Sequence, residues 1–183
     1  MKELARVAYL EKEQVPEDKR WLYDNMEKSR GSGSNIFKAA AHNARVMRGM
    51  MVLGTALLEK SKLDARLREL AILRVGQMTN CQYEQAHHIL MGRRAGVTDA
   101  EIAALPNWST SSLFDARDRA VLRFVEEVTK QADASDQTFD ALREYFDQQE
   151  LVELTMTVAY YNMIVRFLVT MRIDLEPGLP LPA

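Results

Sequence analysis

The sequence has few of the residues that cross-link or interrupt a chain. Its 183 residues include one cysteine, five prolines and eight glycines. A single cysteine excludes an internal disulfide framework, which fits a reducing compartment. Three of the five prolines follow Glu176, and none of the five interrupts a strongly periodic segment. The chain can therefore form long uninterrupted helices.

An excess of one charge and a long apolar run are also absent. The net charge is -2 at pH 7, and no run of Lys and Arg with interleaved aromatics occurs, so we expect no nucleic-acid partner. No stretch reaches about 18 apolar residues without a charge, so we expect no membrane span. Residues 1–20 carry charges where a signal peptide needs an apolar core. We therefore expect a cytoplasmic protein.

The remaining composition is that of an ordinary globular domain, with 47% apolar and 27% charged residues. The length suits one domain that buries a core without cross-links. We expect a single domain over residues 1–183, with a core motif at 64–105 and an extended tail at 176–183.

Nearly every segment has helical periodicity, and no strand pattern stands out. Caps and apolar spacing predict helices at 16–30, 36–58, 64–79, 81–95, 98–105, 115–131, 135–146 and 148–171. The predicted fold class is an all-α, single-domain bundle of about seven or eight helices.

The reactive side chains concentrate in one stretch, from Glu69 to His88. If the chain is helical after Cys81, then Cys81, Glu84 and His88 stand at i, i+3 and i+7. At 100° per residue, Glu84 lies about 60° and His88 about 20° from the Cys81 direction, so the three share a face. A thiol, a carboxylic acid and an imidazole on one face suit an acid/base or nucleophilic site. His87 projects away from it.

Each of these residues also has a purely structural interpretation. A lone cysteine among apolar residues is usually inert, whereas a place at a helix N-terminus would lower the pKa of Cys81 and favour reactivity. Glu69 has apolar neighbours and, if buried, would need a partner such as His88 or an arginine. Tyr83 lies about 200° from Cys81 and is at most a supporting group. His42 is expected on a helix surface.

A metal site is disfavoured by the spacing. Positions i, i+3 and i+7 on one helix are not a usual ligand set, and no C-x-x-C or H-E-x-x-H pattern occurs. We expect neither a metal nor another cofactor. The ten methionines are expected to fill core and subunit contacts.

Several motifs together resemble the carboxymuconolactone decarboxylase and alkylhydroperoxidase D superfamily of all-helical, oligomeric proteins. They are R-E-L-A-I-L-R at 68–74, C-x-x-E-x-x-x-H at 81–88 and R-R-A-G-V-T-x-x-E-I at 93–102, with weaker matches at 35–37 and 161–166. The resemblance implies a helical homo-oligomer, a trimer or a hexamer, that acts on a small molecule.

The two branches of this superfamily use the central block differently. The alkylhydroperoxidase D branch has a glutamate, a C-x-x-C pair and a histidine. Glu69, Cys81 and His88 match three of these residues, but Glu84 stands at the second cysteine. The decarboxylase branch has a glutamate and a histidine spaced as Glu84 and His88 are. The sequence thus combines a cysteine from one branch with the E-x-x-x-H of the other.

Three functions follow from this combination. The leading hypothesis is a cofactor-free enzyme in which Glu84 and His88 transfer protons on a small carboxylic acid or lactone, with Glu69 orienting them and Cys81 in the pocket wall. The second is a thiol-dependent peroxidase that uses Cys81 and an external thiol reductant, since no second cysteine is present. The third is a non-catalytic helical oligomer.

Overall fold

The computed structural model describes residues 5–30 and 34–180. This part of the chain forms nine α-helices and four short 3-10 helices, and no strand. The α-helices are α1 Trp21–Arg30, α2 Asn35–Ala40, α3 Ala44–Glu59, α4 Ala65–Met78, α5 Gln82–Arg94, α6 Asp99–Ala104, α7 Ala116–Gln131, α8 Asp136–Arg143 and α9 Gln148–Met171. The 3-10 helices are Lys12–Gln14, Glu17–Lys19, Ala41–Asn43 and Leu105–Asn107. The predicted all-α class is confirmed.

One predicted helix, at 36–58, is two helices in the structure. A 3-10 turn at Ala41–Asn43 separates α2 from α3. Asn43 has extended backbone, and its side-chain oxygen accepts hydrogen bonds from the N–H groups of Arg45 and Val46. This is an N-cap, which starts a new helix instead of continuing the old one. The break adds a helix to the eight predicted segments.

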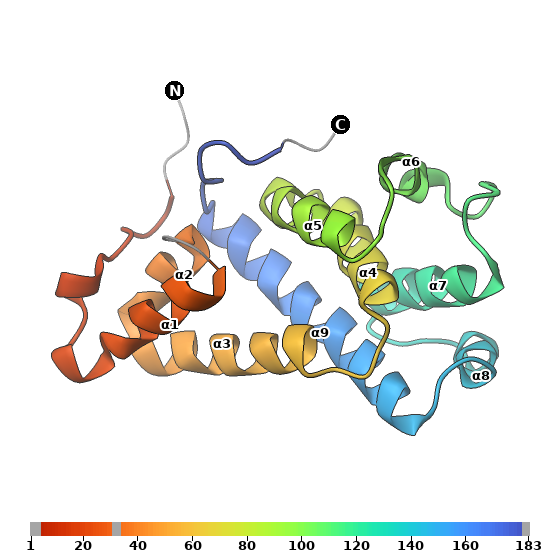
Figure 1. Ribbon diagram of the computed structural model, residues 1–183, viewed down its shortest axis with the longest axis horizontal. Helices are drawn as coiled ribbons and strands as arrows, with labels where there is room; N and C mark the ends of the chain where they lie inside the picture. The colour runs from red at the N-terminus through yellow and green to blue at the C-terminus, as the bar shows by residue number, and fades with distance from the viewer. Residues whose placement is uncertain (1–4, 31–33, 181–183) are drawn as a thin grey trace.

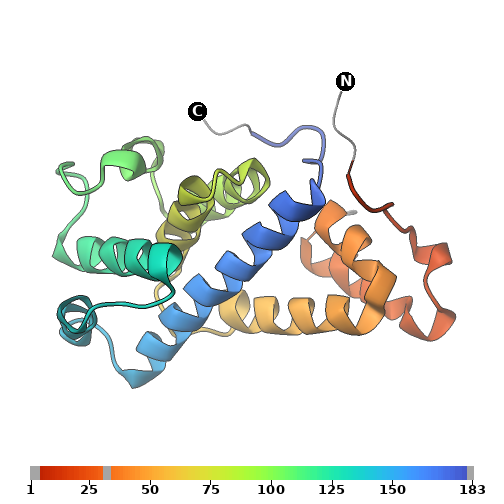
Figure 2. The ribbon, with the colours of Figure 1, turned by 180° about the vertical axis from the view of Figure 1, so that it is seen from behind.

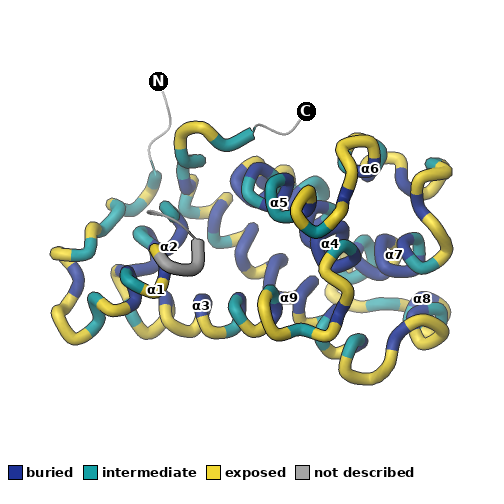
Figure 3. The backbone as a smooth tube through the Cα atoms, in the orientation of Figure 1, coloured by how far each residue is buried: buried dark blue, intermediate teal, exposed yellow. Residues whose placement is uncertain are grey.

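Helix α9 runs through the middle of the molecule, with α1–α3 on one side and α4–α8 on the other (Figures 1 and 2). It contacts α3, α4 and α7. Helix α4 packs against α5, α7 and α9, and nine of its 14 residues are buried. Buried positions gather on these helices (Figure 3). The core therefore surrounds α4, which carries Glu69.

Helix α9 is long and apolar enough, by length and composition, to cross a bilayer. Half of that window is buried inside the protein, and α9 includes the buried polar residue Asn162. Its contacts with α3, α4 and α7 are those of a core helix. An apolar helix of this length can either span a bilayer or lie in the core of a globular protein, and the contacts of α9 are those of a core helix.

Helices α4 and α5 approach closely where a glycine faces the partner helix. A Cβ atom at Gly76 would lie 3.1 Å from Cγ of Gln85 and 3.6 Å from Cβ of Glu84. Such a contact is tighter than ordinary packing, so a larger side chain would require the Gln85 side chain to shift. Gly76 therefore marks a point of close packing between α4 and α5.

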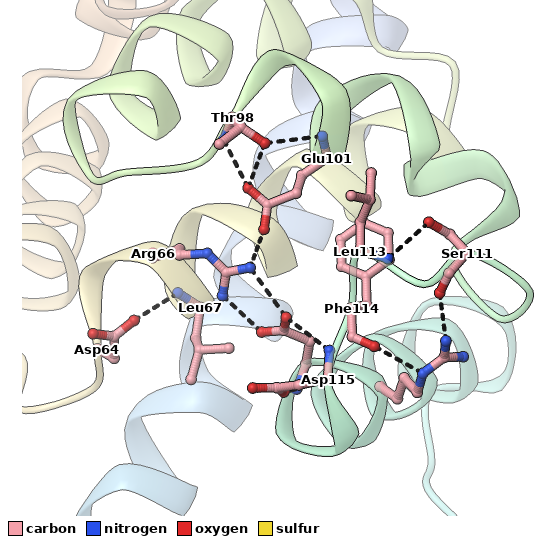
Figure 4. Close-up of polar contacts among 11 residues, drawn as sticks. Asp64, Arg66, Leu67, Thr98, Glu101, Ser111, Leu113, Phe114 and Asp115 are labelled. Atoms are coloured by element: carbon pink, nitrogen blue, oxygen red, sulfur yellow. Dashed lines mark hydrogen bonds and ion pairs between the residues drawn. The ribbon is translucent and has the colours of Figure 1, made fainter.

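A single guanidinium connects the starts of three helices (Figure 4). Arg66 of α4 donates to both carboxylate oxygens of Asp118, at 2.7 and 3.0 Å, and pairs with Glu101. Glu101 and Asp118 each complete a capping box, with Thr98 at α6 and Asp115 at α7. The two capping carboxylates thus satisfy helix N–H groups and the same arginine.

We expect Arg66→Met to lower the free energy of unfolding by about 2–3 kcal/mol, because it leaves the buried carboxylates of Glu101 and Asp118 without their cation. Urea unfolding measures the loss. Arg93→Met is the matched control, since Arg93 pairs with Asp99 on the surface and its loss should change stability by under about 0.5 kcal/mol. Equal effects of the two substitutions would contradict this interpretation.

Candidate active site

The site begins at the turn between α4 and α5. Asn80 has a positive φ of 51°, which reverses the chain after α4. Cys81 follows as the N-cap of α5, and its N–H donates to the carbonyl of Gly76 at 2.9 Å. The turn holds α4 and α5 as a short helical hairpin. Residues on the two facing sides can therefore meet.

His88 lies between two carboxylates from different helices. Its Nδ1 is 2.6 Å from Oε2 of Glu69 on α4, and its Nε2 is 2.9 Å from Oε1 of Glu84 on α5. Glu69 is 1% exposed, and His88 and Glu84 are each 4% exposed. The ring of Tyr161 on α9 packs edge-on against the imidazole at 4.9 Å. The structure thus brings together three of the four predicted site residues around one imidazole.

The carboxylates set the charge of this imidazole. Burial by itself lowers the pKa of His88, but the negative charges of Glu69 and Glu84 and their hydrogen bonds outweigh it and raise the pKa to about 9. His88 is therefore an imidazolium at neutral pH, with both ring nitrogens protonated. It can give up a proton and cannot take one until it has done so.

Arg68 adds a second positive charge beside the site. It is 8% exposed, and its Nε lies 3.6 Å from Oε1 of Glu69. That nitrogen makes no hydrogen bond within the described part of the chain. Glu69 thus has both kinds of partner expected for a buried carboxylate, a histidine and an arginine.

Cys81, the fourth predicted residue, sits at the helix N-terminus as expected but is not activated by it. Burial, together with the charge of Glu84, raises the pKa of the thiol to about 11. The backbone N–H groups of Glu84 and Tyr83 act in the opposite direction and are outweighed. The expectation of a lowered thiol pKa is therefore wrong, because only 2% of Cys81 is exposed.

Tyr83 and His87 lie off this face, as their helical positions predict, and form a second cluster. The Tyr83 hydroxyl donates to Oε1 of Glu176 at 2.6 Å, and Nε2 of His87 is 2.8 Å from Oε2. The two rings stack with centroids 4.6 Å apart. Sequence reasoning missed this cluster because Glu176 lies in the tail, at no helical spacing from α5.

The remaining polar candidates and hollows lie elsewhere. His42 is exposed and bonds the carbonyl of Ala8 at 2.9 Å, as expected of a surface histidine. A hollow of about 770 Å³ lies along α3, and one of about 320 Å³ lies beside Trp108. Neither is lined by the site residues. Within residues 5–30 and 34–180, no group of three His, Cys, Asp or Glu side chains could hold a metal ion.

The charge state of His88 predicts a specific pH dependence of stability. A raised pKa stabilises the folded protein below the unfolded value of 6.5, and this contribution is lost as the pH rises through about 9. It amounts to on the order of 3 kcal/mol. We expect the unfolding free energies of the wild type and His88→Gln to converge between pH 6 and 10, measured by urea titration. A constant difference would contradict the raised pKa.

Residues 44–127 match the sequence profile of the Carboxymuconolactone decarboxylase family. This span contains Glu69, Cys81, Glu84 and His88. An uncharacterized protein of Escherichia coli K12, YnjA, is 30% identical over 122 residues, which are 64% of this chain and 65% of YnjA.

Solved structures share the fold over most of its length. A protein of unknown function from Agrobacterium tumefaciens, proposed to be an antioxidant defence protein AhpD, is 27% identical with a TM-score of 0.70, covering 75% of this chain and 94% of its own. A peroxidase-related protein from Ralstonia eutropha JMP134 with an alkylhydroperoxidase AhpD core is 21% identical, with a TM-score of 0.82 and coverages of 94% and 93%. Residues 44–127 are thus similar to the Carboxymuconolactone decarboxylase family, and the chain shares the fold of proteins with an alkylhydroperoxidase AhpD core.

Proposed function

We propose that this protein is a cofactor-free acid/base enzyme that acts on a small carboxylic acid or lactone, with His88 as the proton-transfer residue. The observation that supports this most directly is the His88 imidazole, bracketed by Glu69 at 2.6 Å and Glu84 at 2.9 Å in a buried setting. A carboxylate-paired imidazole can exchange a proton in the pH range of cells.

In this proposal each side chain has a separate role. Glu69 holds Nδ1 of His88, fixes the ring and stabilises its positive charge. The proton on Nε2, which faces Glu84, is the one that moves. In a decarboxylation, the electrons of the broken carbon–carbon bond remain on the substrate as an enolate while CO₂ leaves. His88 then protonates the enolate carbon and regains its proton from solvent through Glu84.

A thiol-dependent peroxidase is the second candidate. Two observations favour it: Cys81 caps the same helix that carries His88, and a relative with the same fold is described as peroxidase-related. The Cys81 thiolate would attack a hydroperoxide and release an alcohol, leaving a sulfenic acid for an external thiol to reduce. The raised pKa of Cys81 weighs against it, because the thiolate is the nucleophile.

We expect His88→Gln to lower turnover by at least about 10²-fold, because the proton donor is lost. Glu84→Gln should also be severe, whereas Cys81→Ser should retain activity because a hydroxyl can line a pocket. The measurement is CO₂ release or product formation across a panel of small carboxylic acids and lactones. Normal turnover in Glu84→Gln would overturn the acid/base assignment.

Intact-protein mass spectrometry after dilute hydroperoxide, with and without a small thiol, separates the two candidates. Peroxide turnover that disappears in Cys81→Ser would replace the acid/base proposal with the peroxidase, because a serine hydroxyl has too high a pKa to replace a thiolate. An unreactive Cys81 together with an unshifted His88 would favour the third interpretation, a non-catalytic oligomer.

We also propose that the protein is a homo-oligomer, a trimer or a hexamer. Helix α9 is covered on most of its surface but leaves one apolar stripe exposed. Val152, Met156 and Met163 lie within about 40° of one another around the helix and are 62%, 40% and 48% exposed. Exposed apolar residues gathered on one line favour a protein contact over solvent.

Light scattering should give a mass that is a multiple of the 20.9 kDa subunit, and the double substitution Met156→Glu with Met163→Glu should reduce it. Burying two added charges without partners would oppose association. Leu113→Glu, at another position that is 47% exposed, is the control and should leave the mass unchanged. A single 20.9 kDa wild-type species at micromolar concentration would contradict the proposal.

A further inference from the structure

The carboxylate of Glu176 is held by three donors, two of which, Tyr83 and His87, lie on a different face of α5 from His88. Its Oε1 accepts from the Tyr83 hydroxyl at 2.6 Å and from the backbone N–H of Asn35 at 2.5 Å. Its Oε2 lies 2.8 Å from Nε2 of His87. Both carboxylate oxygens therefore have partners. The arrangement is a complete set of contacts for one carboxylate group.

Two of these donors are fixed independently of Glu176. The Tyr83 side chain is buried, and its hydroxyl is 3.0 Å from Oγ of Ser34 and accepts from the N–H of Ile36 at 3.4 Å. His87 stands one turn along α5 and stacks on the tyrosine ring at 30° between planes. Tyr83 and His87 thus belong to the helical body of the protein and are held in place by it.

Glu176, in contrast, belongs to a segment without regular secondary structure. Helix α9 ends at Met171, and the positive φ of 52° at its C-cap Arg172 turns the chain. The segment that follows is held to the body at Asp174, whose carboxylate accepts from the Tyr9 hydroxyl at 3.1 Å and whose carbonyl accepts from the Asn35 side chain at 2.9 Å. Burial raises the pKa of Glu176, but hydrogen bonds from His87, Tyr83 and Asn35 outweigh it, so the group stays ionised.

We propose that the side chains of Tyr83 and His87 and the backbone N–H of Asn35 form a carboxylate-binding site. Glu176 of the same chain occupies this site, and a free small monocarboxylate binds there when the Glu176 carboxylate is absent. The contacts are specific for a carboxylate because they supply donors to both oxygens, and the stacked rings of Tyr83 and His87 form one wall. This inference does not depend on the chemistry of His88, which lies on a different face of α5.

Removing the carboxylate while keeping the site tests the proposal. Glu176→Ala should lower the melting temperature by roughly 3–8 °C, because it removes hydrogen bonds to a charged group. Sodium formate should then recover about half or more of the loss in a saturable manner, and sodium chloride at the same concentration should not. Wild type should not respond to formate. Glu144→Ala, at an exposed glutamate on the C-cap of α8, is the matched control.

The sole cysteine supplies a second readout that needs no substrate. Cys81 caps the helix that carries Tyr83 and His87, so loosening α5 should expose its thiol. Labelling by a disulfide reagent should be at least about tenfold faster in Glu176→Ala than in wild type, and formate should slow it. Adding Tyr83→Phe to Glu176→Ala should abolish the formate effect on both readouts.

The proposal is overturned if formate raises the melting temperature of Glu176→Ala no more than chloride does. It is also overturned if formate has the same effect on the double variant Glu176→Ala with Tyr83→Phe. If Glu176→Ala does not fold, the near-isosteric Glu176→Gln is used with Cys81 labelling, and a rate equal to wild type overturns it as well. Because neither readout is enzyme activity, failure here and failure of the acid/base proposal are distinguishable.

Discussion

A charged imidazole between two buried carboxylates organises the contact between α4 and α5. Glu69 comes from one helix and Glu84 from the other, and each would be a costly buried charge without His88. Separating the helices would take Glu69 away from His88 and leave it with Arg68 as its cationic partner. The two helices also pack closely at Gly76, where a Cβ would meet Cγ of Gln85 at 3.1 Å. The ion cluster and the helix packing therefore depend on each other.

The same buried environment favours the charged form of His88 and the neutral form of Cys81. For His88 the charged form is favoured, because two carboxylates outweigh the loss of water and raise the pKa to about 9. For Cys81 the neutral form is favoured, because burial and the negative charge of Glu84 raise the pKa of the thiol to about 11. At neutral pH the site holds a proton on both groups. This state suits proton donation better than thiolate attack.

Local interactions made most of the fold predictable from the sequence. Asp64, Thr98 and Asp115 cap α4, α6 and α7 through residues three positions ahead, so their effect can be read without knowing the tertiary structure. The side-chain period of a helix likewise places Glu84 beside His88 and turns Tyr83 and His87 away. The α2–α3 break shows the limit of this reasoning, because the apolar pattern continues through it while Asn43 caps a new helix.

Features that depend on distant segments could not be predicted in this way. The contact between Tyr83 and Glu176 joins positions 93 residues apart, and only the path of the tail over α5 brings them together. The pKa of Cys81 depends on how completely neighbouring helices exclude water, which no spacing along α5 reports. Glu69 could be predicted in part. Its apolar neighbours in the sequence indicate that it needs a buried partner, but the sequence does not show that His88 and Arg68 are both partners.

The position of the ion cluster in the core also bears on its role. Glu69 lies in a helix with nine of its 14 residues buried, beside Leu70 and Ile72, which are fully buried. A stable bundle does not need charges there, since apolar side chains of similar volume often replace a buried ion pair with no loss of stability. The proposal that His88 transfers protons therefore rests on the geometry of this cluster, one imidazole between two buried carboxylates, and on the raised pKa of that imidazole.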